Sequence, residues 1–239
     1  MEINEYIEKK KKMQELLLTY LENENNVEEN YQNFIDYCNI EEIGKNKFDL
    51  EILLLQLFYI SNDHHRFPSF MSKIETILNN FKNEIKQSFS IKWIVKKFQK
   101  NKRLLLYFLK SKIIESNIDF YNNLREFLSG IGEVRREEYY AYFFTELKPI
   151  FKAEFSKKIE GRIKDSPEIY EQKRELGEND NYICELIRND SINEFIEYVK
   201  KGNVSLTMRI KPSIFETHYY LNRFQNQTLI EYACFFWFD

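Results

Sequence analysis

The residues whose types could do chemistry gather most densely in a basic segment in the middle of the chain. From Lys82 to Lys112 there are ten basic side chains and one acidic side chain, Glu84, in a protein whose net charge is −3. Such a surface attracts nucleic acid, anionic lipid or an acidic protein. A solvated helical face, balanced by the acidic stretch 22–51, would have the same composition. The candidate anion contacts are Lys92, Lys96, Lys97, Lys100, Lys102 and Arg103.

A histidine pair, His64 and His65, is the segment that most invites a metal-site interpretation. Adjacent side chains diverge on a helix or strand, and no Cys or carboxylate cluster stands at ligand spacing around them. We therefore expect no metal here. The pair is expected to cap a helix that starts near Pro68 or to contact Asp63.

Catalytic motifs do not stand out from the sequence. Gly130 and Gly132 form part of a Gly-x-Gly-x-x-Gly pattern, but position 135 is Arg and a helix precedes them, so the dinucleotide-binding context is missing. The sequence contains neither G-x-x-x-x-G-K-[ST] nor G-x-S-x-G. Its acidic residues are spread along charged faces, with no pairing beyond chance. We expect a non-enzymatic protein with no catalytic residues and no cofactor.

The composition predicts which elements position these residues. Six Gly and four Pro among 239 residues are too few for the many tight turns of sandwiches, barrels or Rossmann sheets. The length corresponds to one or two domains and allows a core without crosslinks. The fold class is therefore predicted to be all-α. The aromatic run 139–144 could stack bases, but aromatics at helical spacing favour a core position.

The cellular compartment is predicted from the pattern of cysteines and from the lack of a membrane-spanning stretch and of a secretion signal. The apolar stretches are far shorter than the ~20 residues of a membrane span, and the first twelve residues do not resemble a secretion signal. Cys38, Cys184 and Cys234 are odd in number and form no C-x-x-C pair, which favours free, buried thiols. We expect a soluble protein of the cytoplasm, with the nucleus as the alternative.

Apolar periodicity divides the chain into helices, many of them short and paired, which is typical of a solenoid. Pro149 is expected to kink or split the longest of them. A Gly-Glu-Asn-Asp turn after residue 176 is the clearest break, so we divide the chain into a helical region, 1–177, and a repeat-like region, 178–239. The predicted helices cover 3–21, 27–43, 48–60, 68–85, 91–98, 103–112, 119–128, 135–160, 167–176 and 181–201.

The repeat-like region begins with a helix-turn-helix hairpin of about twenty residues. Tyr182 to Arg188 predicts a short helix, 189–191 a capped turn, and Ile192 to Lys201 a second helix that ends at Gly202. So small a hairpin cannot bury its own apolar residues. It must therefore stack on a neighbour, as structural repeats do.

These residues resemble the ankyrin repeat, whose first helix opens with a T-P-L-H-x-A pattern. The stretch 228–234, TLIEYAC, is similar to that opening, and 188–204 is similar to the turn, second helix and loop of the preceding repeat, with Asn181 at its Thr position. The spacing from Asn181 to Thr228 exceeds the usual ~33 residues, so about fourteen residues are inserted within 205–227. The ankyrin-like positions are Ile183, Leu186, Phe195, Ile196, Gly202, Thr228, Ile230 and Ala233.

Nearly the whole chain resembles a protist family of ankyrin-repeat proteins that carry an uncharacterised ankyrin-associated domain. The segments that carry this resemblance are 63–66, Phe89 with 101–103, 177–184 and 211–217. It implies a helical region followed by an ankyrin array, with no assigned catalytic residues. The chain reads FFWFD where a second helix is due, so we expect an incomplete array.

The leading hypothesis is a scaffold protein that holds another protein on its exposed surfaces. The alternatives are an anion-binding module, acting through 82–112 on nucleic acid or a membrane surface, and an incomplete copy without function. The apolar segment 233–238 is expected to leave roughly 300–500 Å² uncovered. We predict that its helix folds back onto the hairpin or drives self-association.

Overall fold

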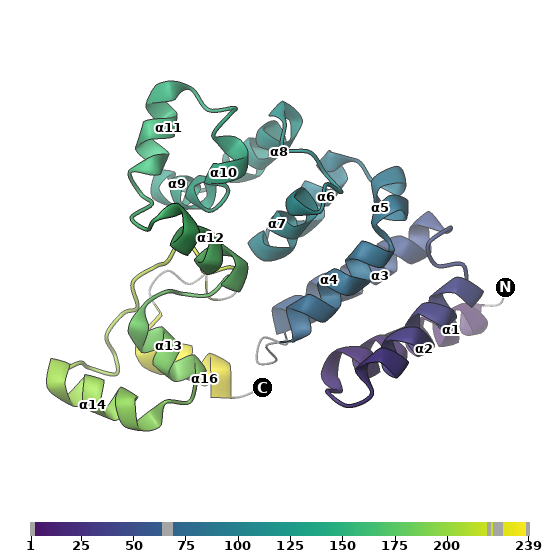
Figure 1. Ribbon diagram of the computed structural model, residues 1–239, viewed down its shortest axis with the longest axis horizontal. Coiled ribbons are helices and arrows are strands. Elements are labelled where there is room, and N and C mark those ends of the chain that lie inside the picture. The colour runs from purple at the N-terminus through teal and green to yellow at the C-terminus, as the bar shows by residue number, and fades with distance from the viewer. Residues whose placement is uncertain (1–2, 64–68, 219–220, 222–226, 238–239) are drawn as a thin grey trace. The chain divides into compact units, whose positions relative to one another are not determined.

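The computed structural model describes residues 3–63, 69–218, 221 and 227–237, and it is built from α-helices (Figure 1). In this part of the chain the only β-type pairing is an isolated antiparallel bridge between Arg209 and Thr228, so the predicted all-α class is confirmed. The chain divides into two compact units, Met1–Ser90 and Ile91–Asp239. Each unit is described by itself.

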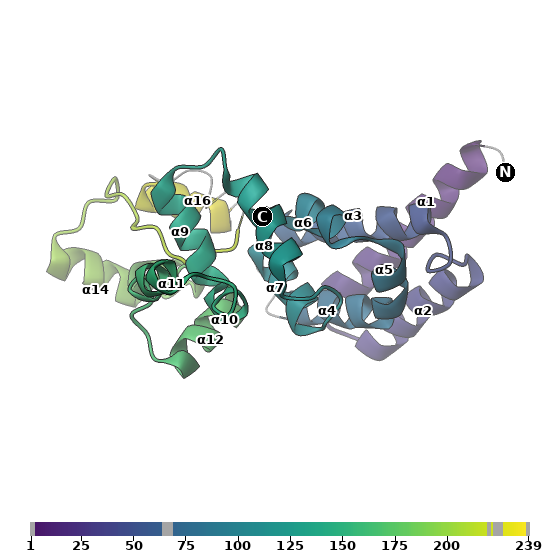
Figure 2. The same cartoon turned by 90° about the horizontal axis from the view of Figure 1, so that it is seen from above.

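The first unit contains two packed helix pairs. Helix α1 packs against α2 and also against α4, which in turn packs against α3 (Figures 1 and 2). Its core is formed by aliphatic and aromatic side chains that recur at helical spacing, among them Met13, Leu17, Phe34 and Ile74. The helices are α1 (Ile3–Glu22), α2 (Val27–Ile40), α3 (Lys47–Asp63), α4 (Phe70–Asn80) and α5 (Lys82–Ser88).

A buried lysine side chain caps the C-terminus of the first helix of this unit. The Nζ of Lys73 donates hydrogen bonds to the carbonyl oxygens of Leu21, at 3.1 Å, and Asn23, at 3.0 Å. Carbonyls at a helix C-terminus have no partner within the helix and carry partial negative charge, so a cation is stabilising there. The contact fixes α4 against the end of α1.

The second unit consists of short helices. Helix α6 packs against α7 and α8, and α9 against α10 and α11. The predicted helix 135–160 is split at Phe143 and again between Leu147 and Ala153, around Pro149. The helices are α6 (Ile91–Phe98), α7 (Lys102–Lys110), α8 (Ile118–Leu128), α9 (Glu133–Tyr142), α10 (Phe144–Leu147), α11 (Ala153–Glu160), α12 (Pro167–Leu176), α13 (Tyr182–Arg188), α14 (Ile192–Gly202) and α16 (Leu229–Trp237).

Aromatic side chains form much of the core of this unit. Tyr142 and Phe143 are fully buried, and the Phe143 ring contacts that of Phe120 at 5.9 Å between centroids. Tyr140 and Phe144 are also buried. The run 139–144 therefore packs in the core, as predicted, and only Tyr139 in it is half-buried while its hydroxyl donates to the Gln99 carbonyl at 2.5 Å.

A fully buried arginine joins α9, α10 and α12. The Nη2 of Arg174 lies 2.6 Å from the Oε1 of Glu146, and its guanidinium stacks over the rings of Tyr142 and Tyr170. The Tyr142 hydroxyl in turn donates to the Arg174 carbonyl at 3.0 Å. A buried charge needs such a partner, so this cluster orders the middle of the unit.

The predicted boundary near residue 178 falls inside the second unit. Gly177 adopts a left-handed conformation (φ 70°), and its carbonyl accepts hydrogen bonds from the backbone N–H and the hydroxyl of Thr217, at 2.9 and 2.7 Å. Arg103, on α7, donates to the carbonyl of Leu176 at 3.0 Å. The turn ends a helix as expected, and the residues after it bond to the same segment as Gly177 does, since the Asn179 side chain donates to the Lys211 carbonyl at 3.4 Å.

All three cysteines are unbridged, as predicted. Cys38 and Cys184 are buried, and burial raises the pKa of both thiols to about 12. Cys234 is exposed, which corrects the expectation of three buried thiols. Among the described helices, none is long and apolar enough to cross a membrane.

Candidate functional site

The repeat-like region folds as the predicted hairpin with a third helix packed on it. Helix α13 contacts both α14 and α16. The shared core consists of Ile183, Cys184, Ile187, Ile210, Leu221, Leu229, Tyr232 and Phe236. The final helix therefore folds back onto the hairpin, which was one of the two predicted outcomes for the apolar C-terminal segment. Of that segment, Phe236 is buried and Ala233 and Phe235 are half-buried.

Capping side chains define the starts of α13 and α16. The Asn181 side chain accepts from the backbone N–H of Ile183 at 3.3 Å. Thr228 and Glu231 cap reciprocally: the Thr228 backbone N–H donates to Glu231 Oε2 at 2.7 Å, and the Glu231 backbone N–H donates to the Thr228 hydroxyl at 3.3 Å. This arrangement is a capping box at the start of α16.

Arg188 connects the end of α13 to its surroundings. Its Nη1 donates to the hydroxyl of Tyr232, on α16, at 2.8 Å and to the carbonyl of Asn179 at 3.0 Å. Its Nε pairs with Glu178 at 3.0 Å. One side chain thus holds both the turn before α13 and the helix α16.

The ankyrin-like positions separate into a buried set and an exposed set. Ile183 and Leu186 are buried, and Phe195 and Ala233 pack at the edge of the core. Ile196 and Ile230 are 43% and 52% exposed, and Thr228 caps α16. Gly202 is the last residue of α14, but the left-handed residue behind it is Asn203 (φ 48°), which corrects the expected glycine stop.

An apolar stripe on α14 extends beyond the core that it covers. Phe195 and Val199 lie at its inner edge and pack against the core. Ile192 and Ile196 lie one turn apart at its outer edge and are 59% and 43% exposed. This outer edge of α14 is an apolar surface that the described part of the chain leaves uncovered.

The six candidate anion contacts do not form one surface. Lys92, Lys96 and Lys100 are exposed, and Lys97 lies over the Trp93 ring at 5.6 Å. Arg103 is half-buried and bonded to the end of α12. Lys102 is only 5% exposed, so it cannot lie on a docking surface for a macromolecule.

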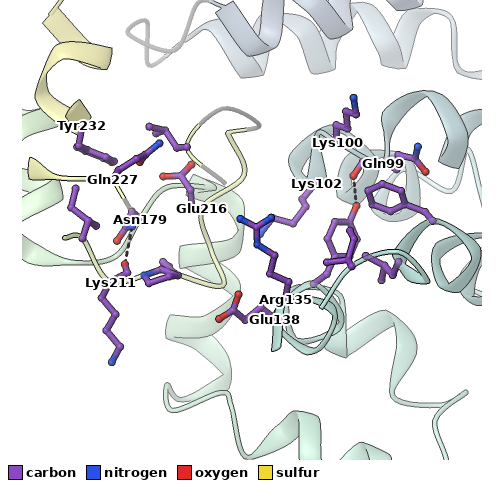
Figure 3. Close-up of a pocket in the computed structure, with 18 residues that line it drawn as sticks. Gln99, Lys100, Lys102, Arg135, Glu138, Asn179, Lys211, Glu216, Gln227 and Tyr232 are labelled. Carbon is purple, nitrogen blue, oxygen red and sulfur yellow. Dashed lines mark hydrogen bonds between the residues drawn. The ribbon is translucent and has the colours of Figure 1, made fainter. Parts of the chain in front are cut away.

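Lys102 instead lines a cavity of about 290 Å³ in the second unit (Figure 3). Its walls come from the start of α7, from α8 and α9 with the glycine-bearing turn between them, and from the segment 210–216 with α16. Lys102 and Arg135 project into the cavity from α7 and α9, and Glu216 faces them from the opposite segment (Figure 3). Glu138 lines the same side as Arg135.

Burial governs the charges in this cavity. It lowers the pKa of Lys102 to about 8, against the opposing effect of Glu216 and Glu138. It raises the pKa of Glu216 to about 7, although the His218 N–H, Lys102 and Arg188 favour the ionised carboxylate; Glu178 favours the neutral form. It also raises the pKa of Glu138.

Of the lining residues, Lys100 and Lys102 are among the predicted anion contacts, whereas Arg135, Glu138 and Glu216 lie far from them in the chain and were not predicted. His64 and His65 lie outside the described residues. Among the described residues, no group of three His, Cys, Asp or Glu side chains could hold a metal ion. No protein-family model, curated protein or solved structure matches this chain.

Proposed function

We propose that this chain is a non-enzymatic binding protein of the ankyrin-repeat type that holds another protein on its C-terminal hairpin. The observation that carries the proposal is the uncovered outer edge of α14, where Ile192 and Ile196 are exposed beside the packed Phe195 and Val199. An apolar helix edge of this kind contributes most to binding when a partner removes it from water.

Two further features support the repeat-type interpretation. Paired helices recur along the chain, as in α1 with α2, α6 with α7 and α13 with α14. The capping box at Thr228 and Glu231 and the fold of α16 onto α13 agree with one unit stacked on the start of the next. A solenoid presents an extended surface, which suits a protein partner.

The test is an affinity purification with the full chain and a variant that carries Ile192→Glu and Ile196→Glu. A matched control carries Ile40→Glu, since Ile40 on α2 is 77% exposed and lies in the other unit. We expect a protein that is retained by the wild type and the control and lost from the double variant. Equal retention by all three chains would refute the proposed surface.

The alternative is binding of nucleic acid or anionic lipid by the exposed lysines of α6. Lys92 and Lys96 are one turn apart and exposed, which is the observation that favours it. Because phosphate binding releases counterions, it weakens steeply with salt. A complex that persists from 50 to 300 mM NaCl would favour the apolar surface of α14, whereas one that dissociates over this range would favour α6.

A further inference from the structure

The cavity beside Lys102 carries an inference that is independent of the protein-binding surface. Its volume of about 290 Å³ is near the lower end of the ~300–1,000 Å³ usual for small-molecule sites. Its charged lining contains four basic side chains, Lys100, Lys102, Arg135 and Lys211, and two acidic ones, Glu138 and Glu216. Lys100 and Lys211 are exposed and extend away from the cavity, so Lys102 and Arg135 are the basic groups that project into it (Figure 3).

Lys102 has unused hydrogen-bonding capacity in this cavity. Its Nζ donates one hydrogen bond, to the Ile214 carbonyl at 2.8 Å, and lies 4.7 Å from the centroid of the Tyr142 ring. Among the described residues it forms no ion pair with a carboxylate, and Glu216 and Glu138 favour its charged form without direct contact. An ammonium carries three N–H donors, and a buried cation without an anionic partner is costly. An anion brought next to Nζ would be strongly favoured.

At neutral pH the two acidic side chains of the cavity carry less than two full negative charges. Burial raises the pKa of Glu216 to about 7, so its protonated form is populated at neutral pH. Burial also raises the pKa of Glu138. A protonated carboxyl group can donate a hydrogen bond. Glu216 in its protonated form can therefore donate a hydrogen bond to a bound anion.

The remaining wall is largely apolar and aromatic. Phe127 and Ile131 lie on the side of α8 and the following turn, with Tyr139 on α9 and Tyr232 on α16. Such a wall suits an apolar body about as large as one aromatic ring. Lys102 and Arg135, projecting together from one side (Figure 3), mark where the charged end of a ligand would lie.

We propose that this cavity binds a small organic oxyanion, a carboxylate or a phosphate monoester on a ring-sized apolar body, with the oxyanion held by Lys102 and Arg135. The charged group and the apolar body of the ligand both contribute to its binding. The charged group supplies the partner that Lys102 lacks, and the body occupies the aromatic wall.

Calorimetric titration of the full chain at pH 7 and 150 mM NaCl tests this with four probes: benzoate, phenyl phosphate, inorganic phosphate and the neutral benzyl alcohol. We expect benzoate or phenyl phosphate to bind at least tenfold more tightly than both benzyl alcohol and inorganic phosphate. Which of the two binds better identifies the oxyanion. No saturable binding of either up to 10 mM would overturn the proposal, as would equal affinity for benzyl alcohol or inorganic phosphate.

Two variants locate the site. Lys102→Met keeps most of the length of the side chain and removes its charge. Arg135→Gln changes a half-buried residue and serves as the second variant if the first does not fold. Each is expected to weaken binding at least tenfold. Lys92→Met with Lys96→Met removes two exposed charges outside the cavity and is expected to leave affinity within twofold. An equal loss in this control would show that general charge attraction is responsible, and the proposal would be wrong.

Discussion

Replacing Arg174 with methionine tests whether the buried ion cluster holds the second unit together. Arg174 is fully buried, and its Nη2 lies 2.6 Å from the carboxylate of Glu146, whose side chain is 12% exposed. The change removes the cation and leaves the Glu146 charge in a site with little access to water. Breaking a buried pair in this way costs about 3–5 kcal/mol. That is a large share of the ~5–15 kcal/mol that stabilises a typical folded chain.

Urea denaturation followed by tryptophan fluorescence measures this loss, because both tryptophans, Trp93 and Trp237, belong to the second unit. With an m-value of about 2 kcal/mol/M, a loss of about 4 kcal/mol lowers the midpoint by roughly 2 M. Unchanged m-values are needed for this comparison. A variant chain that loses less than about 1 kcal/mol would refute the assigned role of Arg174.

A second variant separates the ion pair from the packing of its side chains. Arg174→Met combined with Glu146→Leu removes both charges and fills the site with apolar groups. Replacing a whole buried pair in this way is often neutral or stabilising, and Glu171, the other acidic partner, is 35% exposed and can be hydrated. We expect the double variant to be more stable than Arg174→Met alone. A double variant as unstable as the sum of both single changes would show that no pairing energy was present.

Three further changes have definite expected results. Gly177→Ala should lower the free energy of unfolding by at least about 1–2 kcal/mol, because φ is 70° and the new Cβ would lie 2.8 Å from the Thr217 hydroxyl. Gly130→Ala, where the new Cβ meets open space, should be nearly neutral in the same urea denaturation experiment. Protonation of Glu216 stabilises the fold by up to about 3 kcal/mol below pH 4.5, and this contribution is lost as the pH rises to about 7. Glu216→Gln should make the melting temperature less dependent on pH between these two values. Thr228→Ala should cost about 1 kcal/mol through loss of the capping box, seen as a lower urea midpoint.

Helix positions could be predicted from the sequence because the apolar period is strong, but two helix breaks could not. Phe81 separates α4 from α5, and Phe143 separates α9 from α10. Both adopt nearly the same non-helical backbone, with φ of −98° and −100° and ψ of 15° and 22°, and both rings are buried. Phenylalanine continues the apolar period at each position. The position of each helix break therefore depends on where the phenylalanine ring packs in the core, and the local sequence does not show this.

The basic segment shows a second limit of local patterns. Its net charge is a property of neighbours in sequence, whereas binding depends on which side chains share a surface. Lys100 is exposed and Lys102, two residues later, is buried. The acceptor of the Lys102 hydrogen bond, the carbonyl of Ile214, lies 112 residues further along the chain. A distant contact of this kind turns part of a predicted surface into the wall of a cavity.

One signal for the cavity was nevertheless present in the sequence. Lys102 lies on the same face of its helix as Leu105, Leu106 and Leu109, at spacings of three, four and seven residues, and these three side chains are buried. A lysine within an apolar stripe must either extend to water or find a partner inside the protein. Here the ammonium remains inside with a single carbonyl acceptor. The position of that lysine in the apolar period, more than the charge of the segment around it, is the feature that indicates a ligand site.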